Sequence, residues 1–428
     1  MLDRKTAPSQ SSFQPFVIKQ VENSVLDNGV PVHLLQSGNQ TLLKLEFVFK
    51  AGSWFETKAG VSYLSSKMLV EGTSTKSAKQ IADTIAGFGA FSEVHQGHEH
   101  VNLTFYLLEK HLQNLLPIVA DILLQSNYPE DELENLKKIT IQTAKVNREK
   151  NQFIASAEFR KNIFGAEHPY GRQYWEEDIS VLSGEDISEF AKNHFYTSNM
   201  EVFVSGQFNK ESTFKSLNFY FGQIEKQQSE QHIKEYPFAQ RRKAEILIEK
   251  PDAMQSSIRL GGQSIGRKEA GYIPLLVANE LLGGFFGSRL MKNIREDKGF
   301  TYGIHSSLHS MINGAYFVIS TDVKKENTLQ TLDEIQKELE ILKTQEVDGE
   351  ELEIVKSYML GRFMNSINTP FALMDKFKTL HYTNLDYSYY SDYVLAVQKV
   401  SKIDIQEVVS KYLNISQFSQ VVVGGGLN

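Results

Sequence analysis

The chain has 428 residues, more than one hydrophobic core usually organises, so we expect two or more domains. Its net charge is −7 and no stretch is dominated by lysine or arginine, which argues against a nucleic-acid-binding protein with a basic face. There are no cysteines, so disulfides and thiolate chemistry are excluded and any metal site must use histidines and carboxylates.

The sequence also bears on the compartment. The amino-terminal segment MLDRKTAPSQSSFQPF is polar and lacks the apolar core of a secretory signal. The longest apolar candidate for a membrane span, Leu103 to Leu124, is interrupted by charged residues and a histidine: Glu109, Lys110, His111 and Asp121. We therefore expect a soluble, cytoplasmic protein with no membrane and no nucleic acid among its partners.

Taken in chain order, the first half contains both strand-like and helix-like patterns of apolar residues. Leu43–Phe49 and Val101–Leu107 are predicted strands, and a loop at 51–53 follows the first of them. Apolar residues at helical spacing predict one helix between an N-cap at Ser77 and a stop at Gly87, and another from Leu112 to Leu123. Pro129 is predicted to open a further helix, at its first turn, that ends near Lys150.

The sharpest internal feature is a repeat. Ile187–Gly206 (ISEFAKNHFYTSNMEVFVSG) matches Ile405–Gly424 at a constant offset and without a gap, and Ser183 and Asp186 match Ser401 and Asp404 at the same offset. Each copy is predicted to be an amphipathic helix, a polar turn and a strand that ends on glycine.

A second match supports a duplication. Ala59-Gly60, Leu64 and Gly72 recur at a second, nearly equal offset as Ala270-Gly271, Leu275 and Gly283. The polar segment Glu225–His232 (EKQQSEQH) is the predicted linker, with a boundary near residue 235. The sequence thus predicts an α+β protein of two tandem homologous domains, 17–230 and 243–428, each mainly an antiparallel sheet packed against helices.

Several motifs resemble the pitrilysin (insulinase-like) zinc peptidases. AGSWFETKAGVSYLSSKMLVEGT (51–73) is similar to the zinc-site region of that family, HPYG (168–171) to a downstream element, and SRLMKNIREDKGFTYG (288–303) to its C-terminal signature. Similar pieces extend from about Val21 to Gly426. The resemblance implies the pitrilysin fold and a zinc peptidase ancestry.

The zinc motif itself is degenerate. The family has an inverted His-x-x-Glu-His motif on a helix, in which the histidines bind the metal and the glutamate activates water. Here the matching residues are Tyr63, Ser66 and Lys67, and the third ligand position, a glutamate in the family, aligns with Ala144. Tyrosine and lysine, with ordinary pKa values of about 10, are protonated at neutral pH, and serine is a poor base. We expect no metal and no cofactor in this chain.

Other ionisable residues offer alternatives. His98 and His100 are predicted to lie on a strand, where residues two apart share a face and could bind one metal, although cavity-facing polar residues are the simpler explanation. Lys67 with a lowered pKa could act as a general base. His305 and His309 are predicted to be cavity or surface residues on a strand, and His168 to be structural.

The second half keeps a feature that the first half has lost. Arg295 and Tyr302 match an Arg/Tyr pair that in the family reaches across to substrate at the zinc site. A guanidinium and a phenol can donate hydrogen bonds to a substrate carbonyl and to an oxyanion. The same two residues also have a purely structural interpretation, as a helix-surface charge and a core aromatic.

A departure at the predicted edge strand limits the resemblance. The family usually has Asn-Ala where this chain has Glu93-Val94. Main-chain pairing to an extended peptide would survive this change, but the asparagine contacts would not, so direct peptide binding by the first half is doubtful.

Three hypotheses follow. The first is a non-catalytic subunit of a two-chain zinc metallopeptidase, a heterodimer in which Arg295 and Tyr302 complete the active site of a zinc-bearing homologous partner, with peptide substrate in the shared cavity. The second is a non-enzymatic scaffold or peptide-binding homologue. The third is an independent enzyme that uses His98 and His100, or Lys67. We favour the first.

Overall fold

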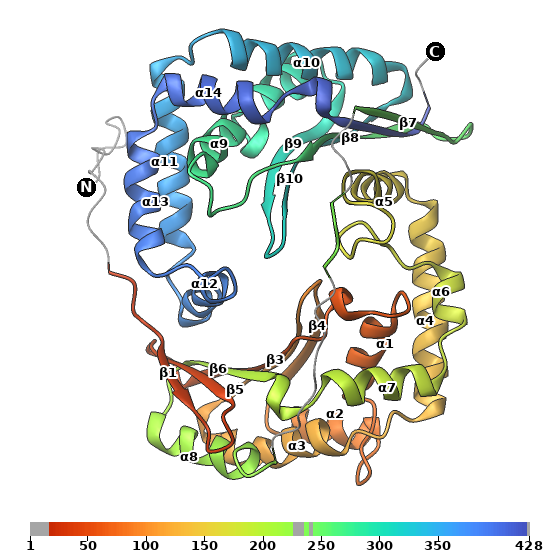
Figure 1. Ribbon diagram of the computed structural model, residues 1–428, viewed down its shortest axis with the longest axis vertical. Coiled ribbons are helices and arrows are strands. Elements are labelled where there is room, and N and C mark those ends of the chain that lie inside the picture. The colour runs from red at the N-terminus through yellow and green to blue at the C-terminus, as the bar shows by residue number, and fades with distance from the viewer. Residues whose placement is uncertain (1–16, 226–234, 239–242, 426–428) are drawn as a thin grey trace, which may run out of the picture.

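The computed structural model describes residues 17–225, 235–238 and 243–425 (Figure 1). Within it, strand β3 shows how the first sheet is built. β3 (Leu42–Phe49) alternates: Leu43, Leu45, Phe47 and Phe49 enter one core with the helices, whereas Lys44, Glu46 and Val48 face the opposite side. The strand is therefore central, with one apolar face and one mixed face.

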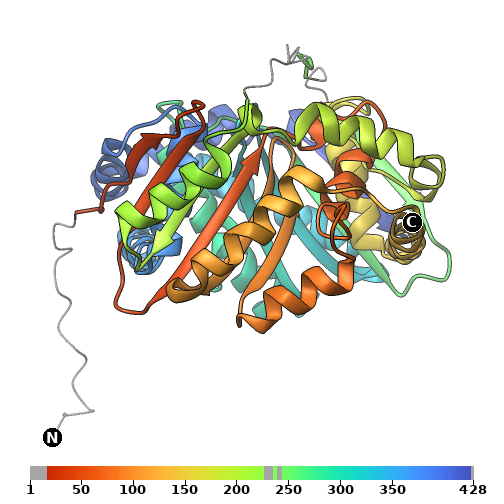
Figure 2. The same cartoon turned by 90° about the horizontal axis from the view of Figure 1, so that it is seen from below.

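The first sheet is six-stranded, with the order β1-β2-β6-β3-β5-β4. Neighbours are antiparallel except β2 and β6, which are parallel. Its other strands are β1 (Glu22–Val25), β2 (Pro31–Gln36), β4 (Phe91–Gln96), β5 (Val101–Leu108) and β6 (Met200–Gly206). Its helices are α1 (Val61–Met68), α2 (Ala78–Gly87), α3 (Leu112–Gln125), α4 (Glu130–Glu149), α5 (Asn151–Phe164), α6 (Glu176–Ser180), α7 (Gly184–His194) and α8 (Lys210–Phe221). Figure 2 shows helices crossing the outer face of this sheet.

The second sheet is five-stranded, with the order β7-β11-β8-β10-β9, and only β7 and β11 are parallel. Its strands are β7 (Ala244–Glu249), β8 (Gln255–Gln263), β9 (Thr301–Ser310), β10 (Ala315–Lys324) and β11 (Ser419–Gly424). Its helices are α9 (Tyr272–Asn279), α10 (Thr328–Thr344), α11 (Gly349–Asn365), α12 (Pro370–Tyr382), α13 (Ser388–Lys399) and α14 (Lys402–Tyr412), with π-helical turns η4 (Glu280–Gly284) and η5 (Met291–Asp297).

The two sheets have the same topology once β1 is set aside, because β2, β6, β3, β5 and β4 correspond in order and direction to β7, β11, β8, β10 and β9. The repeated segments form equivalent elements: α7 and α14 begin at the offset of the first sequence match, and each is capped by a box between serine and aspartate. Helices α1 and α9 begin and end at the offset of the second match. The α+β class with two similar units is confirmed.

The glycine that ends each repeat has a structural reason. Gly206 and Gly424 have φ values of +127° and +134°, and an added Cβ would lie 2.1 Å from the carbonyl oxygen of Leu42 and 2.4 Å from that of Gln255. Only glycine tolerates both this backbone conformation and this close approach of the neighbouring strand.

Each half places one helix on the sheet of the other half. Helix α5 packs against β8 and β11 of the second sheet, while α12 packs against β2 and β6 of the first (Figure 1). Phe159 and Phe164 of α5 share a core with Val318, Val421 and Val423. Met374 and Phe377 of α12 share one with Val48 and Phe203. The mixed face of the first sheet is thereby covered from the second half.

The structure also bears on the individual helices, strands and linker predicted from the sequence. Predicted strands and helices in the first half match β3, β5, α2, α3 and α4 closely, although Pro129 is the N-cap residue of α4 and does not lie in its first turn. Residues 226–232 of the predicted linker lie outside the described residues. Among the described residues no helix is long and apolar enough to cross a membrane.

Candidate functional site

The degenerate zinc positions lie together on α1 and α4, which pack against each other. Lys67 donates from Nζ to the main-chain oxygen of Val94 at 2.6 Å, and Ser66 donates from Oγ to the Tyr63 carbonyl at 2.8 Å. The Tyr63 ring packs on Tyr174, with ring centroids 5.6 Å apart. Ala144 is buried and has no donor atom to offer a metal.

This arrangement does not fit the zinc of the family. Burial lowers the pKa of Lys67, while the nearby Glu93 raises it, and burial raises the pKa of Tyr63. The Lys67 ammonium is held by a carbonyl, and that hydrogen bond favours its protonated form. It also occupies a backbone acceptor of β4, the edge strand of the sheet. None of these side chains offers the imidazole or carboxylate ligands that the zinc of the family requires.

The loop before α1 is fixed by two residues that sequence reasoning did not single out. The buried carboxylate of Glu56 accepts from Ser62 N at 3.1 Å and from Arg172 at 3.0 Å, and Arg172 also donates to the Ser53 carbonyl. Burial raises the pKa of Glu56 to about 7, against the opposing charge of Arg172. The signal was present in the sequence, since Arg172 directly follows the HPYG element and Glu56 lies within the quoted zinc-site region.

The prediction that His98 and His100 share a strand face is wrong. They lie between β4 and β5 in the hairpin turn, and their rings diverge. His98 contacts Ser53 Oγ at 3.0 Å and the Tyr170 ring. His100 packs on Tyr382 of α12, with centroids 4.1 Å apart. A tight turn reverses the chain between them, so the two-residue spacing does not bring their nitrogens together.

Both imidazoles line the junction of the two halves. Burial lowers the pKa of His98 and of His100 to about 4. A cavity of about 350 Å³ lies here between the β4–β5 turn, the β9–β10 turn and α12. The simpler explanation of the histidine pair, polar side chains at a cavity, agrees with this placement.

The remaining predicted histidines are where the sequence placed them. His168 is buried against Trp54, Phe164 and Tyr170, and its Nδ1 accepts from Tyr170 N at 3.0 Å. His305 and His309 are exposed on β9. His168 therefore has a structural role, and His305 and His309 are surface residues.

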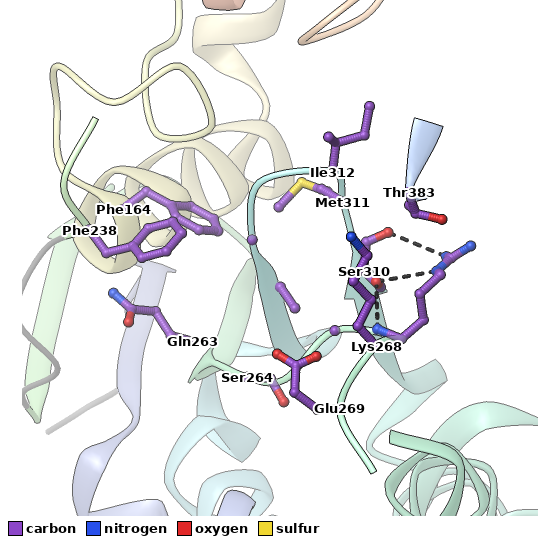
Figure 3. Close-up of a pocket in the computed structure, with 14 residues that line it drawn as sticks. Phe164, Phe238, Gln263, Ser264, Lys268, Glu269, Ser310, Met311, Ile312 and Thr383 are labelled. Atoms are coloured by element: carbon purple, nitrogen blue, oxygen red, sulfur yellow. Dashed lines mark hydrogen bonds between the residues drawn. The ribbon is translucent and has the colours of Figure 1, made fainter. Parts of the chain in front are cut away.

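A second, smaller cavity adjoins this junction. It has a volume of about 240 Å³ and lies beside the Phe164 and Phe238 rings and the β9–β10 turn, as Figure 3 shows. Arg267 donates to Ser310 Oγ and to the Ser310 carbonyl at its wall. The guanidinium is thus used to hold the β9–β10 turn.

Arg295 and Tyr302 lie in the other half of the molecule from α1. Arg295 is on η5, with its guanidinium carbon 4.6 Å from the centroid of the exposed Phe286 ring. Tyr302 is at the start of β9, the edge strand of the second sheet, and is 96% exposed. The structure therefore brings Tyr63, Ser66, Lys67 and Ala144 together as one group, and places Arg295 and Tyr302 on adjoining elements as another.

Models of one peptidase family match two successive segments of the chain. The model of the insulinase family (peptidase family M16) matches residues 32–168, and that of the peptidase M16 inactive domain matches 182–359. The uncharacterized zinc protease YmxG of Bacillus subtilis is 26% identical over 361 residues, covering 83% of this chain and 87% of that protein. The non-peptidase homolog YmxG of Helicobacter pylori is 20% identical over 398 residues, covering 91% of this chain and 90% of that protein.

Solved structures share the fold. A peptidase M16 inactive domain from Pseudomonas fluorescens superposes with a TM-score of 0.84 at 22% identity, covering 95% of this chain and 98% of that one. A protease from Helicobacter pylori does so with a TM-score of 0.86 at 20% identity, covering 95% of this chain and all of that one. Family models, relatives and fold agree: the chain belongs to peptidase family M16, the insulinase family.

Proposed function

We propose that this chain is the non-catalytic subunit of a two-chain zinc metallopeptidase and supplies Arg295 and Tyr302 to the active site of a zinc-bearing homologous partner. The observation that carries the proposal is Tyr302. It is 96% exposed at the edge of a sheet, and among the described residues its hydroxyl has no hydrogen-bond partner. A phenol in this position is available to a second molecule.

The environment of Arg295 supports the same role. Its guanidinium stacks on Phe286 and, within the described ranges, has no carboxylate within 4.0 Å. It lies on a π-helical turn, a rare geometry that is frequent at functional sites. Stacking fixes the plane of the guanidinium, and in the described part of the chain its N–H donors have no partner. A group that must stabilise charge on an incoming substrate needs such free donors.

The proposed division of labour follows from what α1 lacks. Lys67 and Tyr63 offer no imidazole or carboxylate ligand for zinc, so the metal and the metal-bound water belong to the partner. This chain would contribute donors to the substrate carbonyl and to the oxyanion that forms from it. Peptide substrate would lie in a cavity shared by the two subunits, in a heterodimer that we place in the cytoplasm.

One structural comparison supports a pairing of two such units. The periplasmic protease PqqL of Escherichia coli superposes with a TM-score of 0.79 at 13% identity, and the match covers 98% of this chain but 47% of that one. A chain of that protease thus has room for two units of this size. The proposed heterodimer would reach the same content with two chains.

The test is the peptidase rate of the complex purified through its zinc-bearing subunit. Tyr302→Phe removes one hydroxyl and keeps the ring, and Arg295→Ala removes the cation. Loss of one transition-state donor costs about 2.7–4 kcal/mol, so we expect each variant to lower kcat roughly a hundred- to a thousandfold. Tyr220→Phe, which removes a phenol on the distant α8, is the matched control and should keep the full rate.

Assembly is measured beside activity by size-exclusion chromatography. A slow but intact Tyr302→Phe complex supports the donor role. If both variants assemble and cleave at the wild-type rate, the pair is structural and the scaffold hypothesis is the better one. If no zinc-bearing homologue associates with the chain, the two-subunit proposal itself is wrong.

A further inference from the structure

A second group of metal-binding residue types lies far from α1, at the contact between the halves. It consists of His33 on β2, Glu201 on β6 and His381 on α12, whose ligating atoms all lie within 4.8 Å of one another. Glu201 Oε2 is 3.2 Å from His33 Nε2 and 2.7 Å from His381 Nε2. Two imidazole nitrogens and a carboxylate oxygen thus converge on one point.

The fold brings these residues together by register. β2 and β6 pair in parallel with His33 beside Phe203, so His33, Phe203 and Glu201 share one face of the sheet. On α12, Phe377 and His381 are one helical turn apart and point to the same side. The His33 ring stacks on Phe203 at 4.5 Å and meets Phe377 at 5.2 Å, which fixes its orientation.

The contacts of His33 leave its Nε2 atom facing Glu201. Asn23 Oδ1 lies 2.7 Å from His33 Nδ1, so Nδ1 donates to this oxygen and Nε2 is the ring nitrogen that remains. His33 Nε2 lies 3.2 Å from a carboxylate oxygen of Glu201. A metal ion bound between these atoms would have an imidazole nitrogen and a carboxylate oxygen as ligands.

Lysine and arginine side chains do not neutralise Glu201. Within the described ranges no lysine or arginine lies within 4.0 Å of the Glu201 carboxylate, and Lys378 on α12 pairs with Glu46 at 2.7 Å. A metal ion would be bound by both imidazoles and the carboxylate together. The Asn23 contact is also the kind of outer-shell partner that orients a metal-binding histidine.

The sequence led us to expect no metal in this chain, but we propose that His33, Glu201 and His381 bind one divalent transition-metal ion, zinc by the preference of this donor set. His33 is 4% exposed, whereas the Glu201 and His381 side chains are 18% and 34% exposed. A solvent water would be the fourth ligand of the ion. The ion would fasten the first sheet to α12 and so hold the two halves of the chain together.

The test uses the full chain, free of any histidine tag and stripped with a chelator. Co²⁺ is titrated in as a spectroscopic probe for zinc, and bound zinc is counted by elemental analysis after dialysis. We expect about one ion per chain, visible Co²⁺ absorption, and protection of the chain against urea unfolding. Glu201→Gln and His381→Asn should abolish all three, and Asn23→Ala should weaken the affinity about ten- to hundredfold.

Controls keep the result interpretable. His305→Asn removes an exposed histidine on β9, outside the cluster, and should bind like the wild type. Circular dichroism and tryptophan emission show that each variant is folded, and His381, at the partly exposed side of the site, is the variant least prone to misfold. The proposal is overturned if the wild-type chain takes up no Co²⁺ or zinc, or if uptake survives in both Glu201→Gln and His381→Asn. Neither outcome touches the Tyr302 test, because the two share no residue.

Discussion

The ion-pair network under α12 permits a test of how the halves are joined. Glu46, on the mixed face of β3, is 2% exposed and is held by Lys378 from α12 at 2.7 Å and by Lys44 at 3.1 Å. Burial alone would lower the pKa of Lys44, but the charges of Glu46 and Asp375 raise it, so this lysine stays protonated. The Lys378 Nζ atom also lies 5.6 Å from the centroid of the Phe203 ring. Lys378→Met removes this cation and keeps an unbranched side chain of similar length.

The expected cost follows from the burial of Glu46. Removing one partner of a buried ion pair costs about 3–5 kcal/mol because the remaining charge is left desolvated. Lys44 still contacts Glu46, so we expect the low end of that range, about 3 kcal/mol. Lys343→Met, which breaks an exposed pair with Glu340 on α10, should cost under about 1 kcal/mol.

The assay is urea unfolding followed by tryptophan emission. The only tryptophans, Trp54 and Trp175, belong to the first half of the chain, and Trp54 packs in the core that α5 shares with the second sheet, so its emission is sensitive to the contact between the halves. The double variant Lys378→Met with Glu46→Gln should lose less than the sum of the single changes, since no buried carboxylate is then left unpaired. A loss below about 1 kcal/mol for Lys378→Met, or strict additivity in the double variant, would refute the view that this ion pair couples the halves.

Two further predictions rest on particular residues. Ser183→Ala and Ser401→Ala each remove an N-cap from equivalent helices, so each should lower the free energy of unfolding by about 1 kcal/mol in urea titrations; a loss at one site only would count against equivalence. His168 has its pKa lowered to about 4 by burial, so its contribution is complete above the ordinary value of about 6.5 and is lost as the pH falls to about 4. His168→Asn retains an acceptor but does not titrate in this range. From pH 7 to pH 4 its free energy of unfolding, measured by urea titration, should therefore fall less than that of the wild type, by up to about 3 kcal/mol. Identical pH profiles would show that burial does not lower the pKa of His168 in the folded chain.

Local sequence signals were enough to establish the fold class and its duplication. Two constant offsets identified helices and strands that occupy equivalent places in both sheets. Capping residues, alternation and terminal glycines are local features, and the structures that they specify depend mainly on neighbours along the chain. The absence of the usual zinc ligands at Tyr63, Ser66, Lys67 and Ala144 was equally visible, because it depends only on which residue types stand at the positions of the family motif.

Contacts between residues far apart in the chain determine where the remaining site residues lie. The turn between β4 and β5 separates His98 from His100, whereas the crossing of α12 onto the first sheet joins His381 to His33 and Glu201. Neither result can be predicted from the periodicity of the sequence. His33 and Glu201 meet through the register of β2 and β6, and His381 reaches them through the reciprocal packing of α5 and α12. The exposure of Tyr302 is of the same kind: the sequence could not distinguish a core aromatic from a surface phenol, and the structure leaves this phenol exposed at the start of β9.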